Sequence, residues 1–193
     1  MARWEPNAIG RLQEAALELF RERGYDETTV AEIAERAGVT RRTFFRYFTD
    51  KREVLFFGAE KLEAFLVESV VAVPVATPPM EAVAAALDAV ARTSDESSAF
   101  GDFARQRQAL IQTCAALRER ELIKLASLGS VLADALRRRG TADLTASLAA
   151  EAGIAAFKIA FERWVGDSRR GKLRDHVREA MDELKAVASG QIS

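Results

Sequence analysis

Residues 24–51 read GYDETTVAEIAERAGVTRRTFFRYFTDK, and this segment carries the clearest structural signals in the chain. It predicts two short helices joined by a tight turn at Gly38, because glycine readily adopts the positive φ that such a turn requires. Thr29 followed by Glu32 matches a capping box at the start of the first helix, and Thr40 caps the second. Two helices joined in this way form a helix-turn-helix, whose second helix enters the major groove of DNA.

Positive charge is concentrated around this stretch, although the chain of 193 residues has a net charge of only −1. Residues 1–35 hold four Lys or Arg against eight Asp or Glu, whereas residues 36–52 hold six against one. A DNA-binding protein needs a local basic surface more than a basic chain. The arginines could also form only a solvated surface, but charge, capping and turn signals coincide here and favour DNA binding.

The exposed positions of the second helix are predicted to contact DNA. Arginine can bind guanine or a phosphate through two hydrogen bonds, whereas threonine and tyrosine mostly hold phosphates. The start of such a helix usually meets the base edges, which favours base contacts from the early arginines. The residues assigned to DNA from their positions are Thr40, Arg41, Arg42, Thr43, Arg46 and Tyr47.

Residues 9–55 resemble the N-terminal domain of TetR/AcrR-family transcriptional regulators. The matching residues are Ala15, Ala16, Phe20, Gly24, Tyr25, Thr29, Val30, Ile33, Ala34, Ala37, Gly38, Val39, Thr43, Phe44, Phe48 and Lys51. The resemblance implies phosphate contacts from Thr29, Tyr47 and Lys51. The family usually has a tyrosine at the position of Phe45, whose ring lacks the hydroxyl that would reach a phosphate, so Phe45 is assigned to packing. The form of residues 41–48 also resembles a subgroup whose C-terminal domains bind acyl-CoA-like ligands.

The rest of the chain predicts an all-α fold of about nine helices, because apolar residues recur at helical spacing and strand alternation is lacking. The predicted helices are 6–23, 29–37, 40–48, 50–70, 80–92, 99–112, 115–139, 142–165 and 172–188. The fourth is predicted to run without a break from a DNA-binding domain, 1–56, into a ligand-binding and dimerisation domain, 57–193. A continuous helix at that boundary would transmit movement between the two.

Two helices near the C-terminus are predicted to form a homodimer. Residues 142–165 are apolar on most sides and rich in alanine, and 172–188 carry one apolar stripe opposite charged residues. Together with their copies in a second subunit they could form a four-helix bundle, and the two-fold symmetry would match a near-palindromic operator in double-stranded DNA. The alternative is that both helices are simply the core of a monomer.

A binding site for a small hydrophobic ligand, of acyl type, is also predicted in the second domain. A charge on an otherwise apolar helix needs a partner. The partner of Arg107 or Lys158 could be the acidic end of such a ligand, or it could be Glu151 or Glu162 of the protein itself. The predicted ligand-binding residues are Phe65, Phe103, Arg107, Ile111, Phe157, Phe161 and Trp164. Each of them could instead be ordinary core.

Composition argues against several other classes of protein. The single Cys114 and single His176 leave no internal disulfide and no evident metal site, so no metal or cofactor is expected, and no enzyme is indicated. The N-terminus lacks an apolar signal core, and the protein is expected to be cytoplasmic without membrane contact. The sequence therefore favours a ligand-responsive repressor. The alternative is a helix-turn-helix regulator whose C-terminal domain only dimerises and has no inducer.

Overall fold

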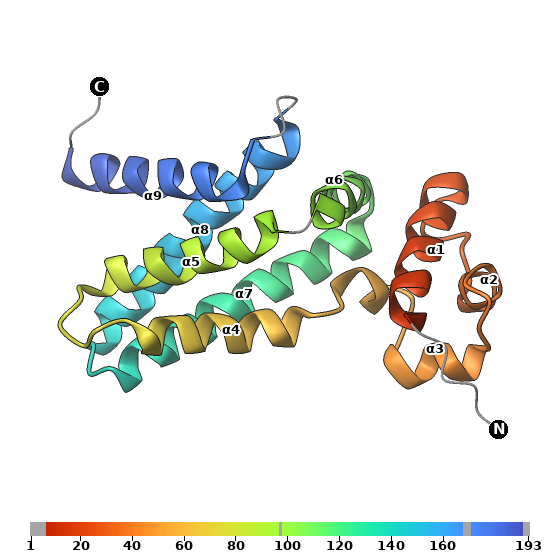
Figure 1. Ribbon diagram of the computed structural model, residues 1–193, viewed down its shortest axis with the longest axis horizontal. Coiled ribbons are helices and arrows are strands. Elements are labelled where there is room, and N and C mark those ends of the chain that lie inside the picture. The colour runs from red at the N-terminus through yellow and green to blue at the C-terminus, as the bar shows by residue number, and fades with distance from the viewer. Residues whose placement is uncertain (1–6, 97, 168–170, 191–193) are drawn as a thin grey trace. The chain divides into compact units, whose positions relative to one another are not determined.

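The computed structural model describes residues 7–96, 98–167 and 171–190. Within these ranges the chain forms nine α-helices, one short 3-10 helix and no strand, which confirms the all-α prediction (Figure 1). The elements are α1 (Ala8–Arg23), α2 (Val30–Arg36), α3 (Arg41–Tyr47), η1 (Glu53–Phe56), α4 (Ala59–Ala72), α5 (Pro79–Asp95), α6 (Ser98–Thr113), α7 (Ala115–Arg138), α8 (Asp143–Gly166) and α9 (Leu173–Ser189). The predicted start of the first helix, Pro6, lies outside the described residues.

The predicted fourth helix, 50–70, is wrong in its first part. The carboxylate of Asp50 accepts backbone hydrogen bonds from Arg52 at 2.7 Å and Glu53 at 3.2 Å, which opens the tight turn of η1. The three apolar residues that follow in η1 are all buried, and one face of an α-helix cannot bury three consecutive residues. Gly58 then has a φ of 92°, and α4 begins only after it. The backbone is therefore not one continuous helix at this point.

The chain forms two compact units. The first comprises the described residues up to Gly58 together with Gln106–Glu121, and the second comprises Ala59–Arg105 and the residues from Leu122 onward. The helices α6 and α7 each contribute to both units. The functional division into domains 1–56 and 57–193 stays a proposal, because the turn between α6 and α7 belongs by its contacts to the first unit.

The first unit is built on α1, which packs against α2 and η1, while α2 packs against α3. Local sequence explains how these elements start and end. Gly24 and Gly38 have positive φ values of 87° and 67°, and the value at Gly38 agrees with the predicted tight turn. The buried residues that the unit's helices share include Leu12, Ala16, Leu19, Phe20, Ile33, Ala34, Phe44, Phe48, Val54 and Leu55.

In the second unit α5 packs against α4, α8 and α9, and α8 also packs against α9. The small residues of α8 make its crossing with α5 possible. A Cβ atom added to Gly153 would collide with the side chain of Val83, so only glycine allows this approach of the two helices. The buried residues of α8 are Ala146, Ala149, Ala150, Gly153, Ile154, Ala156, Ala160 and Trp164.

Helix α9 is attached to α5 by two carboxylates. Asp95 accepts the backbone N–H groups of Leu173 at 2.8 Å and Arg174 at 3.1 Å, so a residue of α5 caps the start of α9. Asp88 binds the guanidinium groups of Arg174 and Arg178, both at 2.8 Å. Its hydrogen bond with Arg174 is the main reason why the pKa of Asp88 lies below the ordinary value.

The face of α8 that points away from α5 and α9 carries large apolar side chains that are exposed to solvent. Leu144, Leu148 and Ile159 are exposed, and Val187 of α9 is exposed as well. Length and composition alone would let α8 cross a membrane, the one such helix in the described part of the chain. However, a buried face of α8 packs on α5 and α9, as in the core of a soluble protein, and its exposed apolar stripe needs a separate explanation.

Candidate DNA-binding surface

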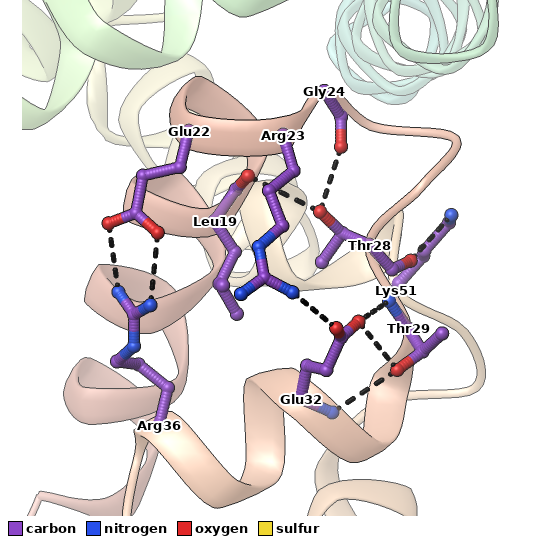
Figure 2. Close-up of polar contacts among 9 residues, drawn as sticks. All are labelled: Leu19, Glu22, Arg23, Gly24, Thr28, Thr29, Glu32, Arg36 and Lys51. Atoms are coloured by element: carbon purple, nitrogen blue, oxygen red, sulfur yellow. Dashed lines mark hydrogen bonds and ion pairs between the residues drawn. The ribbon is translucent and has the colours of Figure 1, made fainter.

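The start of α2 is held by the predicted capping box, which Figure 2 shows. The backbone N–H of Thr29 donates to the carboxylate of Glu32 at 2.8 Å, and the backbone N–H of Glu32 donates to the hydroxyl of Thr29 at 3.2 Å. Arg23 pairs with the same carboxylate at 2.6 Å. The hydrogen bonds from Thr29 are the main cause that holds the pKa of Glu32 below its ordinary value. Thr29 is exposed, but its hydroxyl already takes part in this cap.

Lys51 binds the backbone of the α1–α2 turn. Its ammonium group donates to the carbonyl oxygens of Tyr25 at 2.6 Å, Asp26 at 3.2 Å and Thr28 at 2.8 Å, and it lies 4.3 Å from the centre of the Tyr25 ring. An ammonium group has three donors, so all of them are used here. Thr28, which is fully buried, continues the network, because its hydroxyl contacts the carbonyl oxygens of the end of α1 (Figure 2). Lys51 thereby joins the segment after α3 to the turn before α2.

Replacing Lys51 with methionine should lower the free energy of unfolding of the DNA-free protein by about 2 kcal/mol, because hydrogen bonds from a charged group to three carbonyls are lost. Denaturant unfolding without DNA measures this. Lys185→Met is the matched control, since Lys185 is exposed and lies 3.5 Å from Asp182 at its nearest approach; its effect should stay below about 0.5 kcal/mol. A lysine that served only to hold a phosphate would leave DNA-free unfolding unchanged, and that result would contradict the prediction.

Helix α3 is short and begins with a threonine cap. The hydroxyl of Thr40 accepts the backbone N–H of Thr43 at 3.1 Å, and the two hydroxyl groups lie 3.1 Å apart. Arg41 and Arg42 are exposed, and neither forms an ion pair with any described residue. They follow the cap directly, at the end of the helix that meets base edges in helix-turn-helix proteins.

Arg46 and Tyr47 form a pair on the same exposed surface. The guanidinium group of Arg46 donates to the hydroxyl of Tyr47 at 2.9 Å and lies 4.8 Å from the centre of its ring. The stacked arrangement limits the freedom of the arginine while its charge stays accessible, which suits a contact with the DNA backbone.

The basic surface is smaller than the sequence count indicated. Arg36 forms ion pairs at 3.0 Å with both Glu22 and Glu18 of α1, and these carboxylates raise the pKa of its guanidinium group. Figure 2 shows the pair with Glu22. Arg52 lies 3.5 Å from Asp50, and its charge is similarly balanced. The positive charge that can attract a DNA phosphate is therefore concentrated on the arginines of α3.

The predicted ligand-binding residues fall into both units. Phe157, Phe161 and Trp164 lie in a row on α8, with ring centres 6.2 Å and 5.5 Å apart, and Phe65 packs on the same core. Phe103 is half-buried on α6. Phe100 stacks on Trp164, and Arg105, which the sequence analysis did not single out, lies over the same indole at 5.4 Å. Nothing local in the sequence distinguishes Arg105 from other arginines.

Arg107 and Ile111 belong to the first unit instead. The side chain of Arg107 is buried, donates to the carbonyl oxygen of Leu55 at 2.7 Å and forms an ion pair with Glu121. Its guanidinium group lies 4.5 Å from the centre of the Phe56 ring, which also contacts the guanidinium of Arg120 at 4.9 Å. Arg120 in turn pairs with Glu53 at 2.6 Å. The α6–α7 turn is thus attached to η1 by two arginines around one phenylalanine.

A capped α2, a tight turn and an exposed, arginine-rich α3 define a helix-turn-helix DNA-binding protein. Residues 12–56 match the family model described as bacterial regulatory proteins of the TetR family, and residues 77–189, more than half of the chain, match the MftR C-terminal domain of that family. The chain belongs to the TetR family of bacterial regulatory proteins. It is a DNA-binding transcriptional regulator and not an enzyme.

The relatives agree with this assignment. The HTH-type transcriptional regulator TcmR of Streptomyces glaucescens is 39% identical over 75 residues, which cover 39% of this chain and 33% of TcmR. Over 96% of this chain and 95% of the other, the structure is similar to FadR of Thermus thermophilus, a TetR-family repressor in complex with lauroyl-CoA, at 25% identity and a TM-score of 0.58. SmeT of Stenotrophomonas maltophilia in complex with triclosan shares the fold, with a TM-score of 0.62, 19% identity and coverage of 93% and 90%.

Proposed function

We propose that this regulator is a cytoplasmic homodimeric repressor, which a hydrophobic small molecule releases from a near-palindromic operator. The observation that carries the ligand part is the similarity over nearly the whole chain to a repressor in complex with lauroyl-CoA. DNA contacts are assigned to Thr29, Thr40, Lys51 and the exposed polar residues of α3. Lys51 would have to exchange a carbonyl of the α1–α2 turn for a phosphate, since all its donors are in use.

The dimer is assigned to α8 and α9. Leu144, Leu148 and Ile159 follow one another at helical spacing and are exposed, and a second copy of the same helix would remove this apolar stripe from water. Burial of apolar area is the dominant favourable term in association. Two DNA-binding units related by two-fold symmetry would then read two half-sites, which gives more contact area than one unit offers.

The ligand is assigned to the aromatic residues of the second unit. Phe157, Phe161 and Trp164 provide an apolar lining, and the guanidinium group of Arg105 lies over the Trp164 ring. An acidic group on an otherwise apolar ligand would pair with Arg105, whose nearest carboxylate, that of Asp102, is 3.5 Å away and exposed. Arg105 is preferred for this role over Arg107, which is already paired with Glu121, and over Lys158, which is exposed and lies 4.0 Å from Glu162.

The test uses a DNA duplex selected from a random pool by the protein itself. DNA binding is measured while lauroyl-CoA, lauric acid or dodecanol is added. Lauric acid and dodecanol have the same hydrocarbon chain length, and only lauric acid carries an acid group. We expect an inducer to weaken DNA binding about 5- to 150-fold, the usual range of coupling between sites. With Trp4 replaced by phenylalanine, Trp164 fluorescence should change over the same concentrations.

Arg105→Met should bring the potency of lauric acid down to that of dodecanol and leave dodecanol unaffected. If a broad set of such compounds changes neither DNA binding nor Trp164 fluorescence, the ligand part of the proposal fails. The C-terminal unit would then serve only for dimerisation, and DNA binding itself would be untouched by that outcome.

A further inference from the structure

Phe45 lies on the exposed side of α3, although its place in the sequence predicts a packing role. Its side chain is 51% exposed, whereas Phe44 and Phe48 of the same segment are buried. The ring meets Phe44 edge-to-face, with ring centres 5.4 Å apart and an interplanar angle of 80°. This contact fixes the position of the ring and leaves about half of its surface available to a partner.

Two neighbours of Phe45 on α3, Arg41 and Arg42, have no ion-pair partner among the described residues. Arg42 precedes it by three residues and Arg41 by four, so both side chains adjoin the ring on the helix surface. Arg46 follows it directly. An exposed phenylalanine surrounded by arginines has no apolar neighbour on its solvent side, so its partner must come from the molecule that the arginines attract.

That molecule is duplex DNA, and its major groove offers one kind of apolar group. Base edges in the groove present hydrogen-bond donors and acceptors, and thymine alone adds a methyl group at C5. We propose that Phe45 is a specificity-determining residue, which packs against the C5 methyl group of one thymine in each half-site. The arginines of α3 read donors, acceptors and phosphates, whereas Phe45 presents the large exposed apolar surface that suits a methyl group.

The experiment removes the methyl group without changing base pairing. A duplex is selected from a random pool by the unaltered protein, and each thymine is replaced in turn by deoxyuridine. At one thymine position of each half-site the substitution should weaken binding about fourfold, the factor expected for one methyl-sized group leaving an apolar contact. Fluorescence anisotropy at fixed salt concentration measures the binding.

The second half of the experiment repeats the binding measurements with the variant Phe45→Ala. This variant should bind the thymine duplex more weakly and should no longer distinguish thymine from deoxyuridine at that position. Phe57→Ala is the matched control, because Phe57 is similarly exposed, also rests edge-to-face on a buried phenylalanine (Phe48) and lies outside α3. It should retain the full discrimination.

Two results would overturn the proposal. One is an unaltered protein that is insensitive to removal of every thymine methyl group, a result that does not depend on how well any variant folds. The other is a Phe45→Ala variant that still binds the thymine duplex about fourfold more tightly than the deoxyuridine duplex. That result would mean that another residue touches the methyl group. Neither result depends on an inducer, so the proposal stands or falls separately from ligand responsiveness.

Discussion

Leu148→Glu should convert the dimer into monomers. The substitution places a carboxylate from each subunit in the proposed α8–α9 interface, and each unpaired ion loses several kcal/mol of hydration when buried. The dimer dissociation constant should therefore rise by at least about a thousandfold. Light scattering at micromolar concentration should report 21.2 kDa for the variant and twice that mass for the unaltered protein. The selected duplex should then engage one DNA-binding unit at a time and bind much more weakly.

Leu122→Glu is the matched control for this experiment. Leu122 lies on α7 and is 55% exposed, against 61% for Leu148, so the same carboxylate enters an equally exposed apolar position outside α8 and α9. This variant should remain dimeric. If Leu148→Glu also remains dimeric, or if Leu122→Glu dissociates to the same extent, the interface does not lie on α8 and α9.

Glu121→Gln should lower the free energy of unfolding by about 3 kcal/mol, because it leaves Arg107 buried with an unbalanced charge. The two side chains are only 8% and 15% exposed, so water can replace little of the lost interaction. The ion pair connects the α6–α7 turn to η1, and its loss should also loosen that turn within the first unit. Urea unfolding followed by circular dichroism measures the change.

Glu179→Gln provides the comparison. Its partner Arg163 lies 3.0 Å away, and both side chains are more than half exposed, so the same chemical change should lower stability by less than about 1 kcal/mol. The double variant Arg107→Met with Glu121→Gln should recover most of the loss, since removing both charges leaves no unpaired ion. If Glu121→Gln and Glu179→Gln lower the free energy of unfolding equally, burial of the Arg107–Glu121 pair does not increase its contribution to stability.

Sequence alone determined the helix-turn-helix, because its signals are local. The capping box of Thr29 and Glu32 and the turn at Gly38 involve groups three to five residues apart, and their geometry follows from the backbone of a single helix end. The helical pattern of the remaining chain is likewise local, and it placed the later helices within a few residues of their observed ends. Family membership likewise follows from sequence, through the matches of residues 12–56 and 77–189.

Tertiary packing sets which side chains remain available to contact DNA or a small ligand. Lys51 meets carbonyl oxygens 23 to 26 residues away, and Arg107 meets Leu55 across 52 residues, distances along the chain at which no local pattern carries information. From sequence, Lys51 is predicted to contact a DNA phosphate and Arg107 a small ligand, and the structure gives each of them partners inside the protein. The burial of three consecutive residues in η1 and the exposure of Phe45 have the same origin. Each depends on what packs around a residue, and that is set by the whole core and not by the residue's own neighbours in sequence.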